Sequence, residues 1–567
     1  MARYGTRTDL LTGVLNQNGF EKNVSKVRTE RSRDSSNAYC YCYFDIHNMK
    51  AVNLTYGKRI GDGVILALRD ILVREFSSDI VGRLDDDHFV VYSYAQDLTV
   101  KLEAIREYCR SKERYLPFEF QVGVYRDNRG AKPDFAIECA RLALQSIKSD
   151  HRQFVKFYCD AMSDEYLNRI YILNHIDQAL SEHWIKVFYQ PIIRSATGKA
   201  SGLEALARWV DPDHGVIMPA QFLPIFEQIH LNAKLDLYIA EEVCREMKMC
   251  REKDYRVLKT SINLSPLDFE SVDMAEEIAA IADRYNIDHE KLVIEISERT
   301  FDEPQKILQD AIRKFHANGF KVAVDNFGSG NSSLSVLENY PFDIIKFDTE
   351  FIRDLDPLGP AAIIIKNLIQ MARELGLRTV AEGIETGVQR DFLKINGCEC
   401  LQGFIFEKPR PLSYYAGAGV SEARNLTEID QETEYYDLIA GVDYKKPYFG
   451  ELPQEVAKVI YEGPWAVLEI SEDKIVFVKS NQRYVDFLVR EEILTKADLE
   501  KDVGQTWVCY RDNKLYDAVL ESVEKRTWVS VADRLNEKQK ITGYLYTMKK
   551  NPITGAYGVL LVVEEDK

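Results

Sequence analysis

The sequence contains no apolar segment long enough to cross a membrane. A spanning helix needs roughly 18 consecutive apolar residues, and no run in this chain approaches that length. The first ten residues, MARYGTRTDL, also lack the apolar core of a secretory signal peptide. These absences predict a cytoplasmic protein with no membrane partner.

Positive charge is scarce as well. The chain has 73 Lys and Arg against 90 Asp and Glu, which gives a net charge of −17. Duplex nucleic acid is a polyanion that favours basic protein surfaces, so this charge excludes it as the main ligand. A small anionic ligand held by a metal ion and a few local basic groups remains compatible with the composition.

Clusters of thiols and imidazoles with the spacing of a zinc site are missing too. The ten cysteines are scattered, and the closest pairs are Cys40/Cys42 and Cys398/Cys400. No matching group of histidines accompanies either pair. We therefore expect buried structural thiols rather than zinc ligands.

What the chain does contain is enough material, 567 residues, for three or four domains. Residues 1–160 alternate helical and strand patterns: a β-rich run at 38–44 ends in Asp45, and residues 62–72 have helical spacing. Residues 79–84 and 89–92 predict two strands of a hairpin whose tip is formed by residues 85–88. A further strand at 118–125 and a helix at 135–147 complete an α/β pattern.

This order of elements resembles the GGDEF, or diguanylate cyclase, domain. The resemblance rests on Asp9-Leu-Leu-Thr-Gly-Val-Leu-Asn16, Phe44-Asp45, Asn53, Gly61-Asp62, Gly82-Arg-Leu84 and Phe89. It covers residues 1–160 and implies a cyclase-like α/β fold. It further implies that Asp45 and Asp87 stand at metal positions, Asn53 and Asp62 at guanine contacts, and Lys148 and Arg152 at contacts to the terminal phosphate of GTP.

The signature hairpin departs from that family. It reads Asp85-Asp86-Asp87-His88-Phe89 where the family has Gly-Gly-Asp/Glu-Glu-Phe. The glycines of the family let the backbone approach the nucleotide phosphates, whereas Asp85 and Asp86 add side chains and like charge there. His88 also replaces a carboxylate. We predict no synthesis of cyclic-di-GMP, and the domain is interpreted either as a retained scaffold or as a module that senses GTP.

Residues 186–402 repeat a different pattern, in which apolar strands end in polar groups and helical segments lie between them. The strands are residues 186–190, 200–204, 260–263, 292–295, 322–325, 344–346, 379–382 and 400–402. This rhythm predicts a parallel α/β barrel with the polar groups gathered at one mouth. The residues two positions before Glu204, Asn263 and Asp325 are small, which leaves room for a hydrated polar centre on that strand face.

Here the chain resembles the EAL domain, a cyclic-di-GMP phosphodiesterase built as a modified TIM (β/α)8 barrel. The resemblance covers residues 165–415. It rests on Tyr189-Gln-Pro191, Glu204-Ala-Leu-Ala-Arg208, Asn263-Leu-Ser-Pro266, Glu295-Ile-Ser-Glu298, Lys346-Phe-Asp348, Ala381-Glu-Gly-Ile-Glu-Thr386 and Gln402-Gly-Phe404.

The resemblance implies a site with two divalent ions, Mg²⁺ or Mn²⁺, which suit an all-oxygen ligand set. Glu204, Asn263, Glu295 and Asp325 would hold the first ion, with Asp325 bridging to the second. Catalysis would fall to Glu204, to Lys346, which orients the water, and to Glu382 near the second ion or as general base. The implied ligand contacts are Gln190, Leu206, Arg208, Asp348 and Gln402, and the implied supports of the loop and site are Glu298, Glu385 and Gly328.

One departure concerns the second ion. The family loop begins Asp-Asp-Phe-Gly, and here it reads Asp325-Asn326-Phe327-Gly328. We expect the Asn326 amide oxygen to serve the second ion without bringing charge, so that ion would bind more weakly. Hydrolysis of cyclic-di-GMP to linear pGpG is the favoured function, and a non-catalytic cyclic-di-GMP receptor or partner-binding scaffold is the alternative. A homodimer through the EAL domain is also expected.

The last segment, residues 440–567, resembles a PAS sensor domain. Residues 465–470 and 474–479 predict a hairpin that is followed by a helix beginning near Asn481. Long antiparallel strands are expected at 541–549 and 557–563. The polar, acidic residues 424–436 before this domain are interpreted as a linker or a bridging helix. The complete prediction is therefore a multidomain α/β protein in which a degenerate GGDEF domain and a PAS-like domain regulate a phosphodiesterase barrel.

Overall fold

The computed structural model describes residues 7–31, 39–76, 80–111, 116–127, 131–148, 150, 152–270, 272–298, 306–328, 334–417, 427–440, 453–460, 463–472, 475–490, 513–534 and 540–564. The chain divides into two compact units, residues 1–175 and 176–567. Within the described residues, no helix combines the length and the apolar character that crossing a bilayer requires. Nine cysteines are free thiols in this part of the chain, and all but Cys159 are buried.

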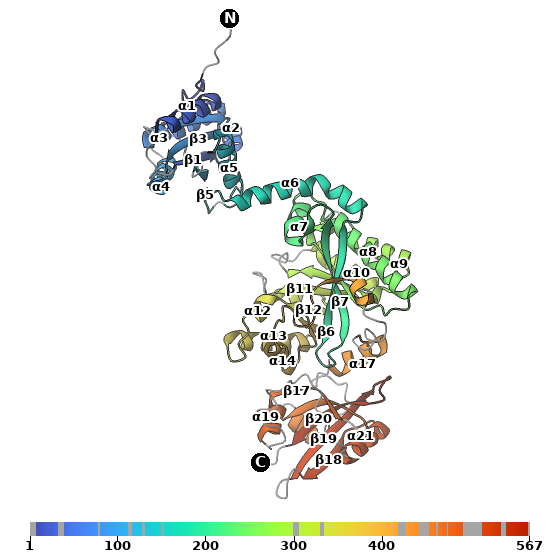
Figure 1. Cartoon of the computed structure of the whole chain (residues 1–567). Helices are drawn as coiled ribbons and strands as arrows, with labels where there is room; N and C mark the ends of the chain where they lie inside the picture. The colour runs from blue at the N-terminus through green and yellow to red at the C-terminus, as the bar shows by residue number, and fades with distance from the viewer. Residues whose placement is uncertain are drawn as a thin grey trace. The chain divides into compact units, whose positions relative to one another are not determined.

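The first unit is built on a five-stranded sheet (Figure 1). Its strands lie in the order β2-β3-β1-β4-β5, and neighbours are antiparallel except for the parallel pair β4 and β5. The strands are β1 (Tyr39–Ile46), β2 (Ile80–Asp85), β3 (His88–Tyr94), β4 (Phe120–Arg126) and β5 (Val155–Phe157). The helices are α1 (Gln17–Arg31), α2 (Met49–Tyr56), α3 (Lys58–Glu75), α4 (Leu98–Arg110) and α5 (Pro133–Gln145).

Alternation along β1 explains why helices cover both faces of this sheet. Cys42 and Phe44 pack into one core with residues of α3 and α4, whereas Tyr41 and Tyr43 pack into a second core with residues of α1 and α5. Successive side chains of a strand point to opposite faces. A β-rich run that is apolar at every position is therefore buried throughout, and the end of β1 places Asp45 beside the hairpin of β2 and β3.

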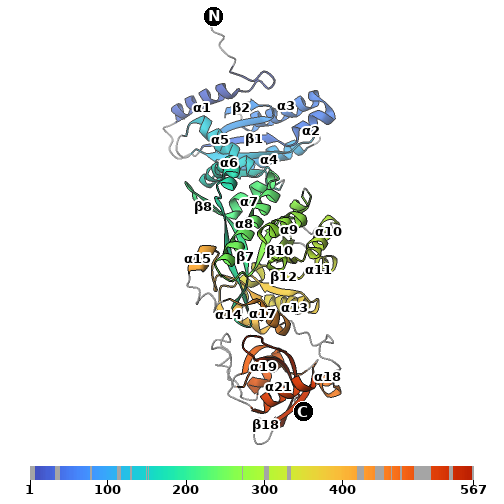
Figure 2. The ribbon, with the colours of Figure 1, turned by 90° about the vertical axis from the view of Figure 1, so that its right-hand side faces the viewer.

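The second unit contains a closed eight-stranded barrel, which forms the central part of Figures 1 and 2. It closes because β6 pairs with both β7 and β14. The barrel strands are β6 (Ile185–Arg194), β7 (Ala200–Asp211), β9 (Lys259–Leu264), β10 (Leu292–Ser297), β11 (Lys321–Phe327), β12 (Ile344–Phe347), β13 (Arg378–Ala381) and β14 (Cys400–Leu401). Short strands β8 (Gly215–Ile217) and β15 (Arg410–Pro411) extend the sheet.

The expectation of a wholly parallel barrel is wrong at the first strand. The other seven strands run parallel to one another, but β6 is antiparallel to both of its neighbours. The cause is the short connection between β6 and β7, a turn in which Gly198 has a φ of +70°. Parallel strands need a crossover of about a dozen residues or more. A connection this short permits only a hairpin.

Helices surround the barrel and fix its strands from outside. Helix α10, for example, buries Leu308, Ile312 and Phe315, which recur at helical spacing on one face. The boundary between the two units falls within α6 (Asp160–Ser181). The helices of the barrel region are α7 (Pro219–Gln228), α8 (Asn232–Glu252), η1 (Pro266–Glu270), α9 (Met274–Tyr285), η2 (His289–Lys291), α10 (Lys306–Ala317), α11 (Ser335–Asn339), α12 (Thr349–Arg353), α13 (Pro360–Glu374), α14 (Gly387–Ile395) and α15 (Leu412–Gly417).

The C-terminal part is an antiparallel five-stranded sheet with helices on both faces. Its strand order is β17-β16-β20-β19-β18. The strands are β16 (Trp465–Ile470), β17 (Ile475–Ser480), β18 (Val529–Arg534), β19 (Lys540–Lys550) and β20 (Tyr557–Glu564). Helices α19 (Gln482–Arg490) and α21 (Asn513–Lys525) pack into the core on one face, and α17 (Asp430–Ala440) and α18 (Gln454–Ile460) into the core on the other. The predicted hairpin and the two long strands are present in the structure.

Candidate active site

Six polar side chains converge at one end of the barrel, five of them at or near the carboxyl ends of their strands and Glu204 within the longer strand β7. They are Glu204 on β7, Asn263 on β9, Glu295 on β10, Asp325 on β11, Lys346 on β12 and Glu382 directly after β13. The register aligns them: Glu295 pairs with Asn263, and Asp325 pairs with Ser297 at the end of β10. We call these six residues the acidic cage. The structure brings these residues together, although the strand expected to end at Glu204 continues to Asp211 in a hairpin with β8.

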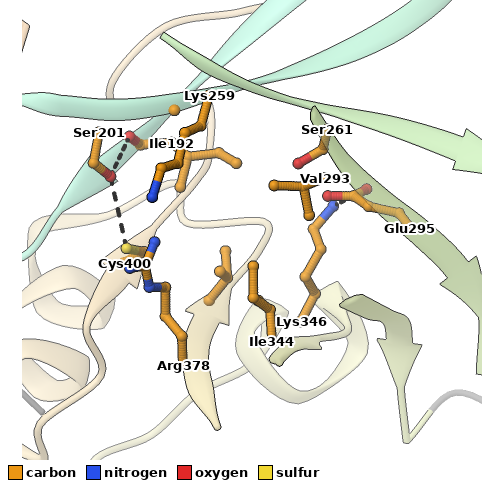
Figure 3. Close-up of a pocket in the computed structure, with 12 residues that line it drawn as sticks. Ile192, Ser201, Lys259, Ser261, Val293, Glu295, Ile344, Lys346, Arg378 and Cys400 are labelled. Carbon is orange, nitrogen blue, oxygen red and sulfur yellow. Dashed lines mark hydrogen bonds and ion pairs between the residues drawn. The ribbon is translucent and has the colours of Figure 1, made fainter. Parts of the chain in front are cut away.

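The Lys346 ammonium lies at the centre of the cage. Its Nζ is 2.7 Å from Glu295 Oε2, 2.6 Å from Glu382 Oε1, 3.1 Å from Glu204 Oε2 and 3.5 Å from Asp325 Oδ1. Figure 3 shows the Lys346 and Glu295 side chains pointing toward one another on one side of the cavity. The Lys346 side chain is only 1% exposed. One buried cation thus faces four carboxylates, and the cage has an excess of negative charge.

Burial and mutual repulsion keep some of these carboxyl groups protonated. Burial raises the pKa of Glu295 to about 8, with Glu204 and Asp325 raising it further against the pull of Lys346. Burial likewise raises the pKa of Asp325, and raises that of Glu382 well above its ordinary value. Glu204 differs, because Lys346 and Gln402 outweigh the effect of burial and lower its pKa. The cage therefore holds exchangeable protons at neutral pH.

The chemistry of the cage fits a divalent cation. All of its candidate ligands are oxygen atoms of carboxylates and one amide, the type that Mg²⁺ and Mn²⁺ prefer. Asp325 Oδ1 is buried, lies 3.5 Å from the Lys346 ammonium and accepts no hydrogen bond from the described residues, whereas Glu382 Oε1 forms a close ion pair with that ammonium at 2.6 Å. Buried carboxylate oxygens without hydrogen-bond donors are costly unless a cation satisfies them.

Asn326 lies beside the cage in an orientation that the sequence did not predict. Its amide nitrogen donates a hydrogen bond to Asp325 Oδ2 at 2.6 Å. The residue has a φ of +55°, a conformation that Asn tolerates better than most residues. Instead of presenting its oxygen as an extra metal ligand, the amide faces the Asp325 carboxylate with its nitrogen.

The expected ligand-binding residues lie around the cage. Gln402 donates to Glu204 Oε2 at 2.6 Å and to Gln190 Oε1 at 3.2 Å, and Gln190 donates to the Glu407 carbonyl. Leu206 and Arg208 follow Glu204 at two-residue spacing on β7 and are half-buried. Burial lowers the pKa of Arg208, and Glu204 opposes that effect. Asp348 is buried and caps α12 by accepting the Glu350 N–H at 2.6 Å.

Two of the three expected supporting residues meet in the loop after β11. The Gly328 N–H donates to Glu298 Oε2, and Gly328 has a φ of +96°. A Cβ at this position would lie 1.9 Å from the Phe351 ring, so only glycine fits. The predicted third support, Glu385, is exposed, and no described hydrogen bond or ion pair joins its carboxylate to the cage. Residues 329–333 of the same loop lie outside the described part of the chain.

A cavity of roughly 30 Å³ lies inside the barrel below the cage (Figure 3). Glu295 and Lys346 line it on one side, and Lys259 and Arg378, the first residues of β9 and β13, line it on the other. A water molecule needs roughly 10–15 Å³ of such space, so the cavity has room for about two waters. A dinucleotide cannot enter it. A large ligand would have to bind at the open mouth above the strand ends.

The first unit brings several of its predicted site residues together as well. Asp45 is buried, and its carboxylate lies 2.8 Å from Lys148 Nζ and 3.5 Å from His88 Nε2. Asp45, Asp87 and His88 offer ligand atoms that all lie within 4.8 Å of one another. Burial raises the pKa of Asp87, with His88 opposing it. Lys148, expected at a phosphate, is thus paired with a carboxylate.

The hairpin tip of this unit is formed by the residues that replace the glycines. Asp85 pairs with His88 across the turn, and its Oδ1 lies 2.5 Å from His88 Nδ1. Asp86 adopts a φ of +23°, and its carbonyl accepts a hydrogen bond from Arg83. Asn53 packs closely against Gly61, the residue before Asp62, since a Cβ on Gly61 would meet the Asn53 side chain; Arg152 is exposed.

Sequence reasoning missed a pair of buried carboxyls that holds the segment after Asn263. The Ser265 N–H donates to Asp236 Oδ2 at 3.0 Å and to Asp268 Oδ2 at 2.9 Å. Burial raises the pKa of both acids, and the Asp268 carboxylate raises that of Asp236 further. One sequence signal was available, because Asp236 stands between Leu235 and Leu237 on an otherwise core-facing stretch of α8.

Two protein-family models match the chain. The model described as "Diguanylate cyclase, GGDEF domain" matches residues 6–153, and the model described as "EAL domain" matches residues 173–409. The chain carries a GGDEF domain and an EAL domain in tandem. The cage belongs to the EAL domain, and the Asp45–His88 hairpin site belongs to the GGDEF domain.

Curated proteins are similar to this chain over 71% of its length. It is 27% identical over 414 residues to the "Bifunctional diguanylate cyclase/cyclic di-GMP phosphodiesterase MucR" of Pseudomonas aeruginosa, covering 71% of this chain and 60% of the relative. It is 27% identical over 418 residues to the "Cyclic di-GMP phosphodiesterase PdeR" of Escherichia coli, covering 71% and 62%. The chain therefore spans less than two thirds of these relatives. A solved structure of the MucR phosphodiesterase with c-di-GMP is 32% identical, covering 43% of this chain and 98% of that one, with a TM-score of 0.41.

Proposed function

We propose that the EAL domain hydrolyses cyclic-di-GMP to linear pGpG with the help of Mg²⁺ or Mn²⁺. The acidic cage carries this proposal, because it gathers an all-oxygen ligand set and one lysine at the open mouth of the barrel. The names of MucR and PdeR as cyclic-di-GMP phosphodiesterases agree with it. Divalent ions supply such a site with charge neutralisation at the phosphate and an acidified water.

The residues of the chain have separate tasks in this proposal. Glu204, Glu295 and Asp325, with the Asn263 amide, would hold the cations, after Glu295, whose pKa is about 8, has lost its proton. Lys346 would then face the phosphate or the attacking water, and Glu382, once it is deprotonated, would accept a proton from that water. Arg208 and Gln190 grip the dinucleotide at the rim, since a guanidinium can donate two parallel hydrogen bonds to a phosphate.

For the GGDEF domain we propose that cyclic-di-GMP synthesis is absent. Asp85 and Asp86 bring two carboxylates to the hairpin tip, and Lys148 is engaged by Asp45. Phosphate groups of GTP would meet like charge where the family has bare backbone. The domain then serves as a scaffold or as a GTP sensor, and the C-terminal α+β domain serves as a PAS-like regulator. A homodimer through the EAL domain and a cytoplasmic location complete the proposal.

A non-catalytic cyclic-di-GMP receptor is the second candidate, and Asn326 favours it. Its amide nitrogen lies 2.6 Å from Asp325 Oδ2, the carboxylate assigned to bridge the two ions. A hydrogen-bond donor at that oxygen competes with a cation for it. In this case the barrel would bind the dinucleotide without cleaving it.

A turnover assay separates the two candidates. Purified full-length protein is incubated with cyclic-di-GMP and Mg²⁺ or Mn²⁺, and pGpG is quantified by chromatography. We expect pGpG from the wild type and none from Glu204→Ala or Glu295→Ala, because each variant loses a charged oxygen ligand. Asp310→Ala, on the exposed face of α10, is the matched control and should remain fully active.

Three outcomes would count against the proposal. Dinucleotide binding without any pGpG would establish the receptor instead. Undiminished turnover in either glutamate variant would remove that residue from the site. Metal-dependent formation of cyclic-di-GMP from GTP by the same preparation would refute the proposal for the GGDEF domain.

A further inference from the structure

Helix α17, between the barrel and the C-terminal sheet, has two faces of opposite chemistry. One face and the residues just before it are acidic, and the other is aromatic and apolar. The acidic residues are Glu428, Glu432 and Asp437, and the apolar ones are Tyr435, Tyr436 and Ile439. All six are described, and all except Asp437 are fully or nearly buried. Because both faces of α17 are buried, the helix is packed between two parts of the protein.

The acidic face is attached to the barrel through ion pairs. Arg194, the last residue of β6, has a completely buried side chain; its Nε is 2.7 Å from Glu428 Oε1 and its Nη2 is 2.7 Å from Asp437 Oδ1. Asp437 Oδ2 also accepts a hydrogen bond from Arg378. Nearer the start of the helix, Lys199 lies 3.2 Å from Glu432. Buried ion pairs of this kind are lost only at high cost, because one partner then stays charged without compensation.

The apolar face is attached to the C-terminal sheet. Tyr435, Tyr436 and Ile439 share one core with residues of β16 and β20. The Tyr436 hydroxyl donates to the buried Glu469 carboxylate at 3.1 Å. Gly558 on β20 allows the close approach, since a Cβ there would lie 2.7 Å from Ile439 and 2.9 Å from the Tyr435 hydroxyl. A movement of the sheet would therefore carry α17 with it.

Asp437 lies among basic residues at the same end of three barrel strands; two of these strands, β9 and β13, lead to the cage, and β6 passes beside it. Arg194 belongs to β6, which carries Gln190; Arg378 begins β13, which leads to Glu382; and Lys259 begins β9, which carries Asn263. Burial and Arg378 lower the pKa of Lys259, and the Asp437 charge opposes them. Although burial favours its neutral form, Arg378, Arg194 and Lys259 lower the pKa of Asp437. Asp437 is thus an ionised carboxylate whose charge partly neutralises all three cations.

The cavity below the cage connects the two ends of these strands. Figure 3 shows Lys259 and Arg378 on the opposite side of the cavity from Lys346 and Glu295. The cavity between Lys259 and Arg378 on one side and Lys346 and Glu295 on the other has a volume that holds only about two waters. If Asp437 left, Lys259 and Arg378 would lose their neutralising charge and repel each other at the floor. The added positive charge would also oppose a divalent cation above it.

We propose that Asp437 is a positioning residue for the acidic cage and that α17 is the element through which the C-terminal domain acts on the barrel. This inference rests on the proposed metal-dependent function of the cage. A signal that displaces the sheet would pull Asp437 away from Arg378 and Arg194. The strand bases would then shift, and the cage would bind its cations less tightly.

The test compares Asp437→Asn with a matched control in the full-length protein. Asn has nearly the same shape as Asp, so Asp437→Asn removes the charge without removing the side chain. The control, Glu432→Gln, breaks a different ion pair of the same helix, one that joins the turn between β6 and β7. Mn²⁺ binding is measured by electron paramagnetic resonance of the free ion, with Glu295→Ala used to identify the barrel-bound fraction.

We expect Asp437→Asn to weaken barrel-bound Mn²⁺ by roughly fivefold or more, within the usual range of coupling between distant sites. Glu432→Gln should change it by less than about twofold, as expected for a partly exposed ion pair. The proposal is overturned if Asp437→Asn binds Mn²⁺ as tightly as the wild type. Because this readout needs no turnover, a wild type that makes no pGpG would defeat the proposed hydrolysis and leave this test intact.

A second variant approaches α17 from the other side. Gly558→Ala should push the helix from β20 by steric contact with Ile439 and Tyr435. We expect the same loss of Mn²⁺ affinity, and in the double variant with Asp437→Asn we expect less than the sum of the two losses, because both act through one helix. This variant also serves if Asp437→Asn fails to fold. Unchanged Mn²⁺ affinity in a folded Gly558→Ala protein would refute the coupling to the C-terminal domain.

Discussion

Replacing Lys346 by methionine tests whether this lysine holds the place of the metal in the unloaded cage. Methionine keeps most of the volume and removes the ammonium that lies within 3.5 Å of four carboxylates. Removal of one partner from a buried ion pair costs about 3–5 kcal/mol, because the other charge is left without compensation. We expect a loss of this order in the free energy of unfolding of the metal-free barrel.

The loss should depend on pH. In the wild type the pKa of Glu295 is raised by burial to about 8, and that of Glu382 is raised well above its ordinary value. A carboxyl whose pKa is higher in the folded than in the unfolded state favours folding below its unfolded pKa, and that advantage is lost as pH rises through the folded pKa. Without Lys346 these pKa values rise further. The variant should therefore be destabilised least at pH 5, where only Glu204, whose pKa Lys346 lowers, loses its compensating charge, and most at pH 8 and above.

Urea unfolding is measured in the presence of EDTA and in the presence of Mn²⁺. Hydrogen exchange in peptides that contain β10 and β12 monitors the transition, so that it is assigned to the barrel. Lys321→Met is the matched control: its ammonium lies 2.8 Å from Asp343, but the side chain is 53% exposed. A surface pair of this kind contributes about 0–1 kcal/mol. Mn²⁺ should restore more stability to Lys346→Met than to the wild type. Equal stability of the two metal-free proteins at pH 8 would refute the reasoning.

Two further predictions concern the metal. Asn326→Asp should raise activity mainly at low Mg²⁺, because it replaces the donor beside Asp325 with a charged oxygen ligand. Turnover is measured as a function of Mg²⁺ concentration in both proteins. If both need the same Mg²⁺ concentration, Asn326 is not a ligand of the second ion. The affinity of the wild type for Mn²⁺ should rise between pH 6 and pH 8, since Glu295, with a pKa of about 8, must lose its proton to bind a cation; calorimetry in buffers of different ionisation enthalpy should detect the released proton, and a pH-independent affinity would contradict the protonated cage.

The strand ends of the barrel could be predicted from the sequence because their signal is local. Apolar runs that stop at or just after Asn263, Glu295 and Asp325 indicate the strand, its end and the inward face within a few residues, whereas β7 continues past Glu204 to Asp211. The disrupted hairpin at residues 85–88 is equally local, since the identity of each side chain at a known turn is read directly. The antiparallel direction of β6 could also have been predicted, because its connection to β7 is too short for a crossover. The repeated pattern of the later strands instead favoured a parallel strand at this position.

Interactions between distant segments were decided only by the tertiary structure. The position of Lys346 among four carboxylates depends on barrel closure, which brings β7 and β13 to one centre across more than 170 residues of chain. The Asp236–Asp268 pair and the Arg194–Asp437–Arg378 contacts likewise join residues whose spacing has no period. Periodicity reports which face of an element is buried, but the charge that meets that face is fixed by how the elements pack.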